Sequence, residues 1–256
     1  MTSRPLFEHD LQHTLANRQK LQTNKNLLYW YQQLYEEMFS DIEGIHSKRV
    51  LEIGSGTSPL SLFYPHVLTS DIMPLEYLDY VFDAHAIDHV EQIGDESLDI
   101  ITLTNVLHHL QEPLVFLINS AIKLKTGGQI IVAEPYFSTV SAWIFSHFHP
   151  EPSIFDITDP VLEKIEGPLS SANQAIPYML FFRKTAWKEA LTEHYSYSER
   201  AISYFSGISY MATGGISRAF PIPHPVYQLF FKLDRTLSMI FPHILSSFFI
   251  VRLIKR

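Results

Sequence analysis

Two glycines separated by one residue close a short apolar run early in the chain. The run 50–53 is apolar except for Glu52, and Gly54 and Gly56 follow it. Residues without a Cβ adopt φ > 0 easily and allow another molecule to approach their backbone closely. A strand that ends in such a turn ahead of a helix is where open α/β sheets bind nucleotide-like ligands. The pattern therefore predicts a ligand-binding turn at these residues.

Three polar side chains follow later apolar runs. Asp71, Asp83 and Asn105 each come where a strand is expected to end. A carboxylate at Asp71 accepts two hydrogen bonds from a ribose diol, and one at Asp83 can read the exocyclic amine of adenine. The alternatives are a helix N-cap for Asp71 and a turn residue for Asp83. Since these strand ends share one edge of the predicted sheet with Gly54, they indicate a nucleoside crevice.

The third position of the dinucleotide pattern G-x-G-x-x-G is Pro59 in this chain. In sites for NAD or FAD a glycine there allows the helix to pack closely on the strand. The proline weighs against both dinucleotides. It leaves open a nucleoside cofactor that has no pyrophosphate.

The elements that position these residues follow from the hydrophobic pattern between residues 48 and 137. Apolar strand-like runs alternate there with helix-like segments, which is typical of βαβ units and a doubly wound α/β sheet. Near-continuous apolar runs indicate strands that are buried on both faces. The expected strands are 49–53, 66–70, 80–82, 98–103 and 129–134.

Helices are expected before and between these strands. Residues 8–46 carry apolar side chains at a helical period, with Asn24 or Asn26 as a cap and Gly44 as an end. A helix over 113–125 is expected to stop at the glycine pair that follows it. Later elements are an irregular insertion at 136–182, a helix at 184–194, a strand at 195–204, a helix at 226–244 and a strand at 248–254.

Composition excludes several classes of function. The 256 residues contain no cysteine, so disulfides, thiolate metal sites and a cysteine nucleophile are ruled out. A net charge of −8 makes nucleic acid a poor partner. The longest uncharged apolar stretch, 236–251, is shorter than the roughly 20 residues of a spanning helix and contains a proline. With no apolar signal core at the N-terminus, a cytoplasmic protein is expected.

Five segments together resemble a known family. The segments VLEIGSG, TSD, FDA, SLDIITLTNVLHHL and LKTGGQIIVAEP are similar to those of the class I S-adenosylmethionine-dependent methyltransferases, close to the type 11 group. The resemblance covers residues 45–137 and extends more weakly to the end of the chain. It implies a Rossmann-like, seven-stranded mixed sheet with an insertion cap after the fifth strand. It also makes 248–254 an inserted strand of an antiparallel final hairpin.

The resemblance implies S-adenosylmethionine as the cofactor. In that family the positions matching Glu52, Gly54 and Gly56 line the methionine part of the cofactor. The position of Asp71 holds the ribose, that of Asp83 faces the adenine, and that of Asn105 lies along the cofactor. With the neighbours of these positions, the expected cofactor-binding residues are Glu52, Gly54, Ser55, Gly56, Asp71, Ile72, Asp83, Ala84 and Asn105. The alternatives are a non-catalytic binding protein of the same fold and an NAD(P)-dependent oxidoreductase.

Candidate bases lie at the end of the fifth strand and in the insertion, where the family builds its substrate pocket. His147 and His149 are candidates because histidine as a residue type suits removal of a proton from a methyl acceptor near neutral pH, and Glu134 is a further candidate. Glu151 lies beside the two histidines. The alternative for this group is a loop with capping histidines.

No metal site is expected. His108 and His109 are adjacent, so a helix would not point both at one site, and a structural hydrogen bond is the favoured interpretation. His85 and His89 are four residues apart, but no carboxylate pattern completes a site there. A solvated helix face is the simpler interpretation of that pair.

The expected organisation is an N-terminal helical segment, 1–47, packed on a methyltransferase domain, 48–256. Two caps are expected within this domain, at about 138–183 and about 205–245. The acceptor is expected to be a small molecule, a glycan or a lipid-linked molecule. Apolar residues near the C-terminus are interpreted as a cap on the sheet, with peripheral membrane contact as the alternative. A monomer or weak dimer is expected.

Overall fold

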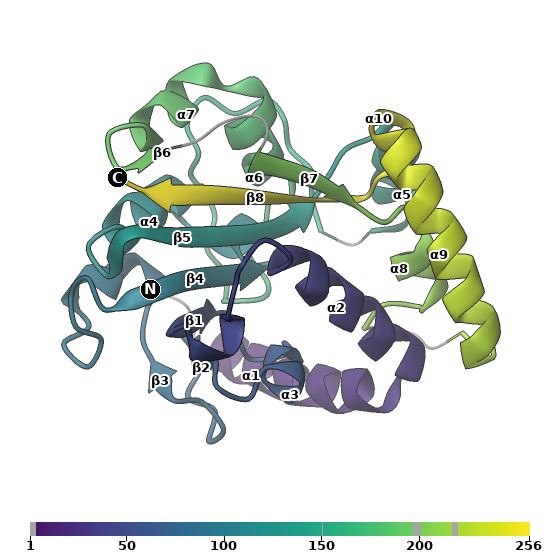
Figure 1. Ribbon diagram of the computed structural model, residues 1–256, viewed down its shortest axis with the longest axis horizontal. Helices are drawn as coiled ribbons and strands as arrows, with labels where there is room; N and C mark the ends of the chain where they lie inside the picture. The colour runs from purple at the N-terminus through teal and green to yellow at the C-terminus, as the bar shows by residue number, and fades with distance from the viewer. Residues whose placement is uncertain (1–3, 150, 197–200, 217–219) are drawn as a thin grey trace.

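A mixed sheet of eight strands forms the centre of the molecule (Figure 1). The structure is a computed structural model that describes residues 4–149, 151–196, 201–216 and 220–256. The strands are β1 (Val50–Ile53), β2 (Leu68–Asp71), β3 (Tyr80–Val81), β4 (Leu98–Thr104), β5 (Leu124–Pro135), β6 (Tyr195–Ser196), β7 (Ile202–Phe205) and β8 (Phe248–Lys255).

The strand order is β3-β2-β1-β4-β5-β8-β6, and the five strands from β3 to β5 are parallel. From β1 the chain builds outward through β2 and β3, and then it returns to the other side of β1 to form β4. The direction of building therefore reverses between β1 and β4. Such a switch point is where doubly wound sheets hold their ligands. The predicted Rossmann-like α/β class is confirmed.

The antiparallel strand β8 lies between β5 and the last edge position. It is the inserted strand that the resemblance implies. The single strand predicted over 195–204 is two short ones: β6 pairs with the end of β8, and β7 pairs with its beginning. Residues 197–200 between them lie outside the described part of the chain. The described sheet has eight strands instead of the predicted seven, because β6 and β7 both pair with the same side of β8.

Alternate residues of the strands face two separate hydrophobic clusters. Ile101 of β4 and Ile130 of β5 belong to one cluster, and their neighbours Ile100 and Ile131 belong to the other. The central strands β1, β4 and β5 are therefore buried on both faces, as their near-continuous apolar sequences predict. Helices α4 (Pro113–Ser120) and α7 (Thr185–Leu191) cover the first face. Helices α2 (Lys25–Met38) and α9 (His224–Ile240) cover the second.

The helices are α1 (Arg4–Thr23), α2 (Lys25–Met38), α3 (Leu60–Phe63), α4 (Pro113–Ser120), α5 (Thr139–Phe148), α6 (Ala175–Tyr178), α7 (Thr185–Leu191), α8 (Ser209–Ala212), α9 (His224–Ile240) and α10 (Pro242–Leu245). Short 3-10 helices lie at Ile45–Ser47, Ala84–His89 and Leu107–His109, and a π-helix lies at Met179–Arg183. No helix in the described ranges has the length and apolar character to cross a membrane.

The N-terminal segment forms two helices. Asn24 separates them, and its side chain accepts a hydrogen bond from the Leu27 amide at 3.1 Å, which makes it the N-cap of α2. Gly44 was expected to end the helix, but α2 already ends at Met38. Gly44 instead adopts φ 63° and precedes the 3-10 helix Ile45–Ser47.

The helix predicted over 113–125 is too long. It ends at Ser120, because Leu124 already pairs with Leu98 in the sheet. The glycine pair that was expected to stop the helix lies inside β5, where the register of β5 against β4 shifts and Gly127 adopts φ 77°. The glycines therefore form an irregularity of the strand and not a helix cap.

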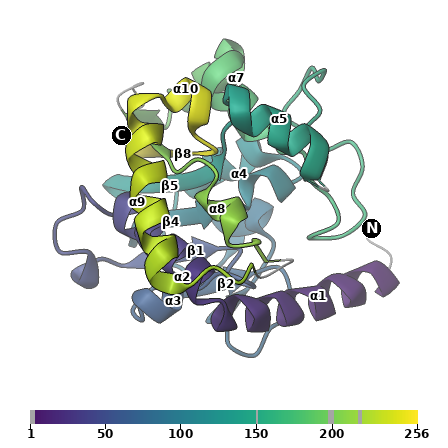
Figure 2. The same cartoon turned by 90° about the vertical axis from the view of Figure 1, so that its right-hand side faces the viewer.

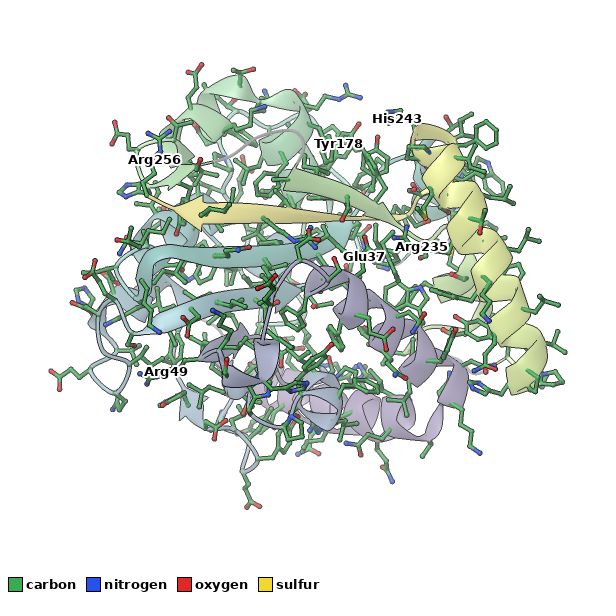
Figure 3. The ribbon with its side chains drawn as sticks, in the orientation of Figure 1. Glu37, Arg49, Tyr178, Arg235, His243 and Arg256 are labelled. Carbon is green, nitrogen blue, oxygen red and sulfur yellow. The ribbon has the colours of Figure 1, made fainter. Side chains whose placement is uncertain are left out.

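The helix predicted over 226–244 is divided into α9 and α10 at Pro242, whose missing amide hydrogen cannot continue the helix. Two contacts fix α9 to the body of the protein. The guanidinium of Arg235 lies 2.8 Å from the carboxylate of Glu37 on α2, and the two side chains face one another in Figure 3. Asp234 is buried and accepts hydrogen bonds from the amides of Gly207, Ile208 and Ser209 at 2.8–3.2 Å.

We expect Asp234→Ala to lower the free energy of unfolding by about 2–4 kcal/mol, since buried amides would lose their acceptor. Asp234→Asn, which keeps one acceptor oxygen, should cost less. Urea denaturation measures both effects. Lys232→Ala, on the exposed side of α9, is the matched control and should change little. Equal stability of Asp234→Ala and the control would contradict this role.

Candidate functional site

The carboxyl ends of β1 and β4 meet at the switch point, and Figure 2 views the molecule from this edge. Gly54 follows β1 with φ 77°. A Cβ at Gly54 would lie only 2.3 Å from Cγ2 of Val106, which follows β4. The loops after these two strands are therefore in contact, and the glycine is required by both its φ and this close approach.

Glu52 lies beneath the glycine turn and is 1% exposed. Its carboxylate accepts hydrogen bonds from the hydroxyls of Ser55, at 2.8 Å, and of Ser58. Burial raises the pKa of Glu52 to about 7, although both hydroxyls oppose the shift. Such a carboxyl group is only partly ionised near neutral pH, and a nearby cation would stabilise its ionised form.

Asp71 ends β2 and is almost fully buried. One carboxylate oxygen accepts the Gly56 amide at 2.9 Å, and the other accepts the Met73 amide at 3.0 Å. Burial raises the pKa of Asp71, and these amides oppose the shift. A Cβ at Gly56 would lie 2.9 Å from the same carboxylate, so this glycine allows the turn and Asp71 to approach. Ile72, which follows, is 43% exposed.

Asp83 caps the 3-10 helix that begins at Ala84. Its side chain accepts hydrogen bonds from the amide of His85, at 3.0 Å, and from the His85 ring, at 2.6 Å. The hydrogen bond from the His85 ring lowers the pKa of Asp83. The Asp83 side chain is half exposed, whereas Ala84 is buried. The histidine pair 85 and 89 does not share a site, because His89 is exposed beside Asp88.

Asn105 follows β4 and is one of the three non-glycine residues with positive φ in the described chain, at 55°. This strained backbone directs its side chain toward the buried hydroxyl of Tyr31 on α2. The buried Oδ1 of Asn105 has no hydrogen-bond partner within the described residues. Because buried polar atoms are normally hydrogen-bonded, this oxygen is available to accept a hydrogen bond from a ligand at the switch point.

Helix α1 covers the glycine turn, a role that its polar sequence did not reveal. Nη1 of Arg18 lies 3.1 Å from the carbonyl oxygen of Ser58 and 3.4 Å from that of Gly56. The guanidinium also lies 4.0 Å from the ring centre of Tyr77, whose hydroxyl donates to the Gly56 carbonyl at 2.6 Å. Helix α1 and the loop after β2 therefore hold the positively charged guanidinium of Arg18 at the turn.

The same helix holds the insertion. Asp10 is 2% exposed and accepts hydrogen bonds from the amides of Leu169 and Ser170 at 2.9 and 3.2 Å. Its other oxygen accepts from the Ser170 hydroxyl at 2.7 Å. Helix α1 thus links the glycine turn to the insertion on the opposite side of the strand ends.

Glu134, at the end of β5, is completely buried. One oxygen accepts the amides of Val106 and Leu107 at 3.0 and 2.6 Å, and the other accepts Nδ1–H of His108. These contacts make Glu134 the residue that holds the loop after β4. Its role as a base toward an acceptor stays a prediction, and its contacts place it behind His108.

His108 and His109 both face the carboxylate of Glu151, which is the arrangement that the sequence argued against. The Nε2 atoms lie 3.3 Å and 3.8 Å from Oε2 and Oε1 of Glu151, respectively. The expectation failed because the pair lies on a 3-10 turn, where the two rings are tilted by 38° with their centres 4.3 Å apart. The expected structural hydrogen bonds are also present, and Nδ1 of His109 lies 2.8 Å from the Ser171 carbonyl oxygen.

The pKa values of the two histidines are shifted in opposite directions by their surroundings. Burial alone would lower the pKa of His108, but the carboxylates of Glu134 and Glu151 outweigh it and raise that pKa to about 10. Burial and the charge of His108 lower the pKa of His109 to about 4. Burial would raise the pKa of Glu151, yet its hydrogen bond with His108 lowers it. Adjacent rings therefore hold different charges at neutral pH.

The two predicted catalytic histidines are not brought together. His149 joins the cluster, because Nε2 of Gln174 lies 2.9 Å from its Nδ1 and donates at 3.0 Å to Glu151. His147 is exposed near the end of α5 and contacts the Trp143 carbonyl and the Ser146 hydroxyl. Chain position alone could not identify Gln174 as a member of this group.

No protein-family model matches the chain, and no curated protein matches it. Solved structures do resemble it. A SAM-dependent methyltransferase from Archaeoglobus fulgidus aligns with 14% identity and a TM-score of 0.48, over 88% of this chain and 94% of that one. The N-methyltransferase NodS from Bradyrhizobium japonicum WM9, solved with S-adenosyl-L-homocysteine, aligns with 13% identity and a TM-score of 0.48, over 96% and 97%.

An S-adenosylmethionine-dependent methyltransferase from Mesorhizobium loti aligns with 12% identity and a TM-score of 0.44, over 87% of this chain and 97% of that one. Likeness at this level of identity and TM-score leaves the reaction to be argued from the residues at the strand ends.

The pKa of Glu52 predicts a pH dependence of stability. The folded value of about 7 exceeds the ordinary value of 4.5, so the folded state binds the proton more tightly. The resulting stability is complete below pH 4.5 and is lost as pH rises to about 7, by about 3 kcal/mol in total. Glu52→Gln has no such loss, so its stability relative to wild type should rise across this interval.

Urea denaturation at several pH values between about 4.5 and 7.5 measures this difference. Glu76→Gln, at an exposed carboxylate beyond β2, is the control and should follow the wild type. Parallel pH profiles for Glu52→Gln and wild type would show that Glu52 ionises normally in the folded protein.

Proposed function

We propose that this protein transfers a methyl group from S-adenosylmethionine to an acceptor bound beneath the insertion. The observation that carries the proposal is the meeting of the loops after β1 and β4 at the switch point, between Arg18 on one side and the 108–109 pair on the other. Ligands of doubly wound sheets bind at this place.

The methionine end of such a cofactor carries an ammonium and a carboxylate. Arg18 provides a guanidinium over the glycine turn, and Glu52 provides a carboxyl group beneath it. Guanidinium groups recognise carboxylates through paired hydrogen bonds. Opposite charges on the two sides of one turn suit an amino-acid zwitterion.

The adenosine end is assigned to the ends of β2 and β3. Asp71 lies at the end of β2 beside the turn and remains the proposed ribose residue, with Asp83 facing the adenine. A dinucleotide would need its pyrophosphate at the start of the following helix. Here α3 has only four residues and Pro59 precedes it, so that anion site is poor.

S-adenosylmethionine supplies a methyl group that is activated by a positively charged sulfur. The residues of this chain bind the cofactor, orient the acceptor and exclude water, which together supply much of the rate. Helix α1 and the insertion, joined through Asp10, cover the strand ends on which both molecules would lie. Of the two candidate histidines, His149 is the one that we propose as the base for an acceptor proton, because it contacts Gln174 beside Glu151.

The acceptor that we propose is a small molecule, a glycan or a lipid-linked molecule. Aromatic rings gather in the insertion and its surroundings, where Phe137 packs edge-on against Phe145, Phe155 and Tyr178. Such rings accept apolar or sugar-like faces. Binding of the cofactor without transfer to any member of a broad acceptor panel would favour the non-catalytic alternative.

We expect S-adenosylhomocysteine, but not NAD, to bind the purified protein in isothermal titration calorimetry. Asp71→Ala should weaken this binding at least tenfold, or about 1.4 kcal/mol, because the ribose diol would lose its acceptor. Glu76→Ala is the matched control. Absence of S-adenosylhomocysteine binding to wild type would reject the proposed function, and unchanged affinity in Asp71→Ala would reject the ribose assignment alone.

Arg18→Ala should also weaken S-adenosylhomocysteine, by roughly tenfold or more, because the cofactor carboxylate would lose a charged partner. Adenosine has no carboxylate, so its affinity should change much less. Lys20→Ala removes a cation from the same helix and serves as the control. An equal loss for both ligands would mean that Arg18 only supports the turn.

A further inference from the structure

A cluster of two imidazoles and one carboxylate lies beside the proposed methyl-transfer site. His108, His109 and Glu151 each offer one ligand atom, and these three atoms all lie within 4.8 Å of one another. In a tetrahedral zinc site the bonds are about 2.1 Å, so neighbouring ligand atoms lie about 3.4 Å apart. The two measured distances to Glu151, 3.3 and 3.8 Å, are close to that spacing.

Each of the three side chains is oriented by a partner behind it. Glu134 accepts Nδ1–H of His108, the Ser171 carbonyl oxygen faces Nδ1 of His109, and Gln174 donates to Oε2 of Glu151. Metal-binding histidines in proteins almost always donate their second nitrogen to a carboxylate or a backbone carbonyl. Each of the three candidate ligands therefore has the supporting hydrogen bond that metal ligands usually have in proteins.

The hydrogen bond of His109 fixes where its lone pair lies. A carbonyl oxygen only accepts, so Nδ1 must carry the hydrogen and Nε2 of the neutral ring must carry the lone pair. That lone pair faces a carboxylate oxygen of Glu151 at 3.8 Å. Two electron-rich atoms held face to face are stabilised by a cation between them.

We propose that His108, His109 and Glu151 bind a divalent transition-metal ion, with Zn²⁺ as the expected ion. Two histidines and one glutamate are the ligand set of catalytic zinc sites, which keep a further position open. The Glu151 side chain is 29% exposed and the ring of His108 only 3%, so solvent reaches the site from the carboxylate side. When the ion binds, His108 releases its Nε2 proton to solvent and coordinates through that nitrogen as a neutral ring, while its Nδ1–H stays with Glu134.

The open position gives the ion a role in acceptor binding, and this part rests on the proposed function. The histidines lie on the loop that begins with Asn105 and Val106 at the end of β4. An acceptor hydroxyl that binds the ion releases its proton to solvent more readily, and its oxygen then becomes the nucleophile. The metal would replace a protein base for this step.

The test uses the full-length protein stripped of metal with a chelator. Calorimetry with ZnCl₂ should show one equivalent bound to wild type. Glu151→Gln and His109→Gln should each weaken binding more than roughly 100-fold, since even loss of an outer partner costs about 10- to 100-fold. Glu163→Gln, an exposed carboxylate of the insertion, and His89→Gln, an exposed histidine, are matched controls that should bind normally.

Two further measurements keep the outcome decisive. Co²⁺ added to stripped wild type should give the visible absorption bands of a low-coordinate nitrogen and oxygen site, which needs no variant to fold. S-adenosylhomocysteine is titrated in the same samples. If it binds wild type while Zn²⁺ and Co²⁺ do not, the metal site is rejected and the proposed function stands. Zn²⁺ binding that survives both Glu151→Gln and His109→Gln would also reject the site.

Discussion

The buried carboxylate of Glu134 fixes the loop on which the candidate site depends. A fully buried carboxylate is costly unless its oxygens are satisfied, and here two backbone amides and the His108 ring satisfy them. The same contacts hold Val106 against Gly54 and aim His108 at Glu151. A single side chain at the end of β5 thereby sets the geometry of the glycine turn on one side and of the histidine cluster on the other.

Helix α1 joins the two halves of the site from outside the sheet. Arg18 contacts the glycine turn and Asp10 contacts the insertion, about two helical turns apart. Because both contacts come from one helix, the covering of the glycine turn and the position of the insertion are coupled. Displacement of α1 would therefore expose both at once.

The sheet could be predicted from the sequence because its central strands are buried on both faces and are therefore apolar runs. The strand ends carrying Gly54, Asp71 and Asn105 followed directly from these runs. Three features were harder to predict from the sequence: the edge strands, the end of α4 and the break at Pro242. Pairing with distant strands decided the first two, and the missing amide hydrogen of the proline decided the third. Local patterns contain no record of such long-range partners.

The histidine cluster shows why side-chain sites were harder to predict. Adjacent residues point apart on an α-helix, so His108 and His109 seemed unable to share a ligand. On a 3-10 turn held by Glu134 their rings lie side by side and face the same carboxylate. That carboxylate, Glu151, comes from a segment with no regular structure, more than forty residues further along the chain. Only the fold brings these groups together, and their shared orientation is what distinguishes a binding site from three unrelated polar residues.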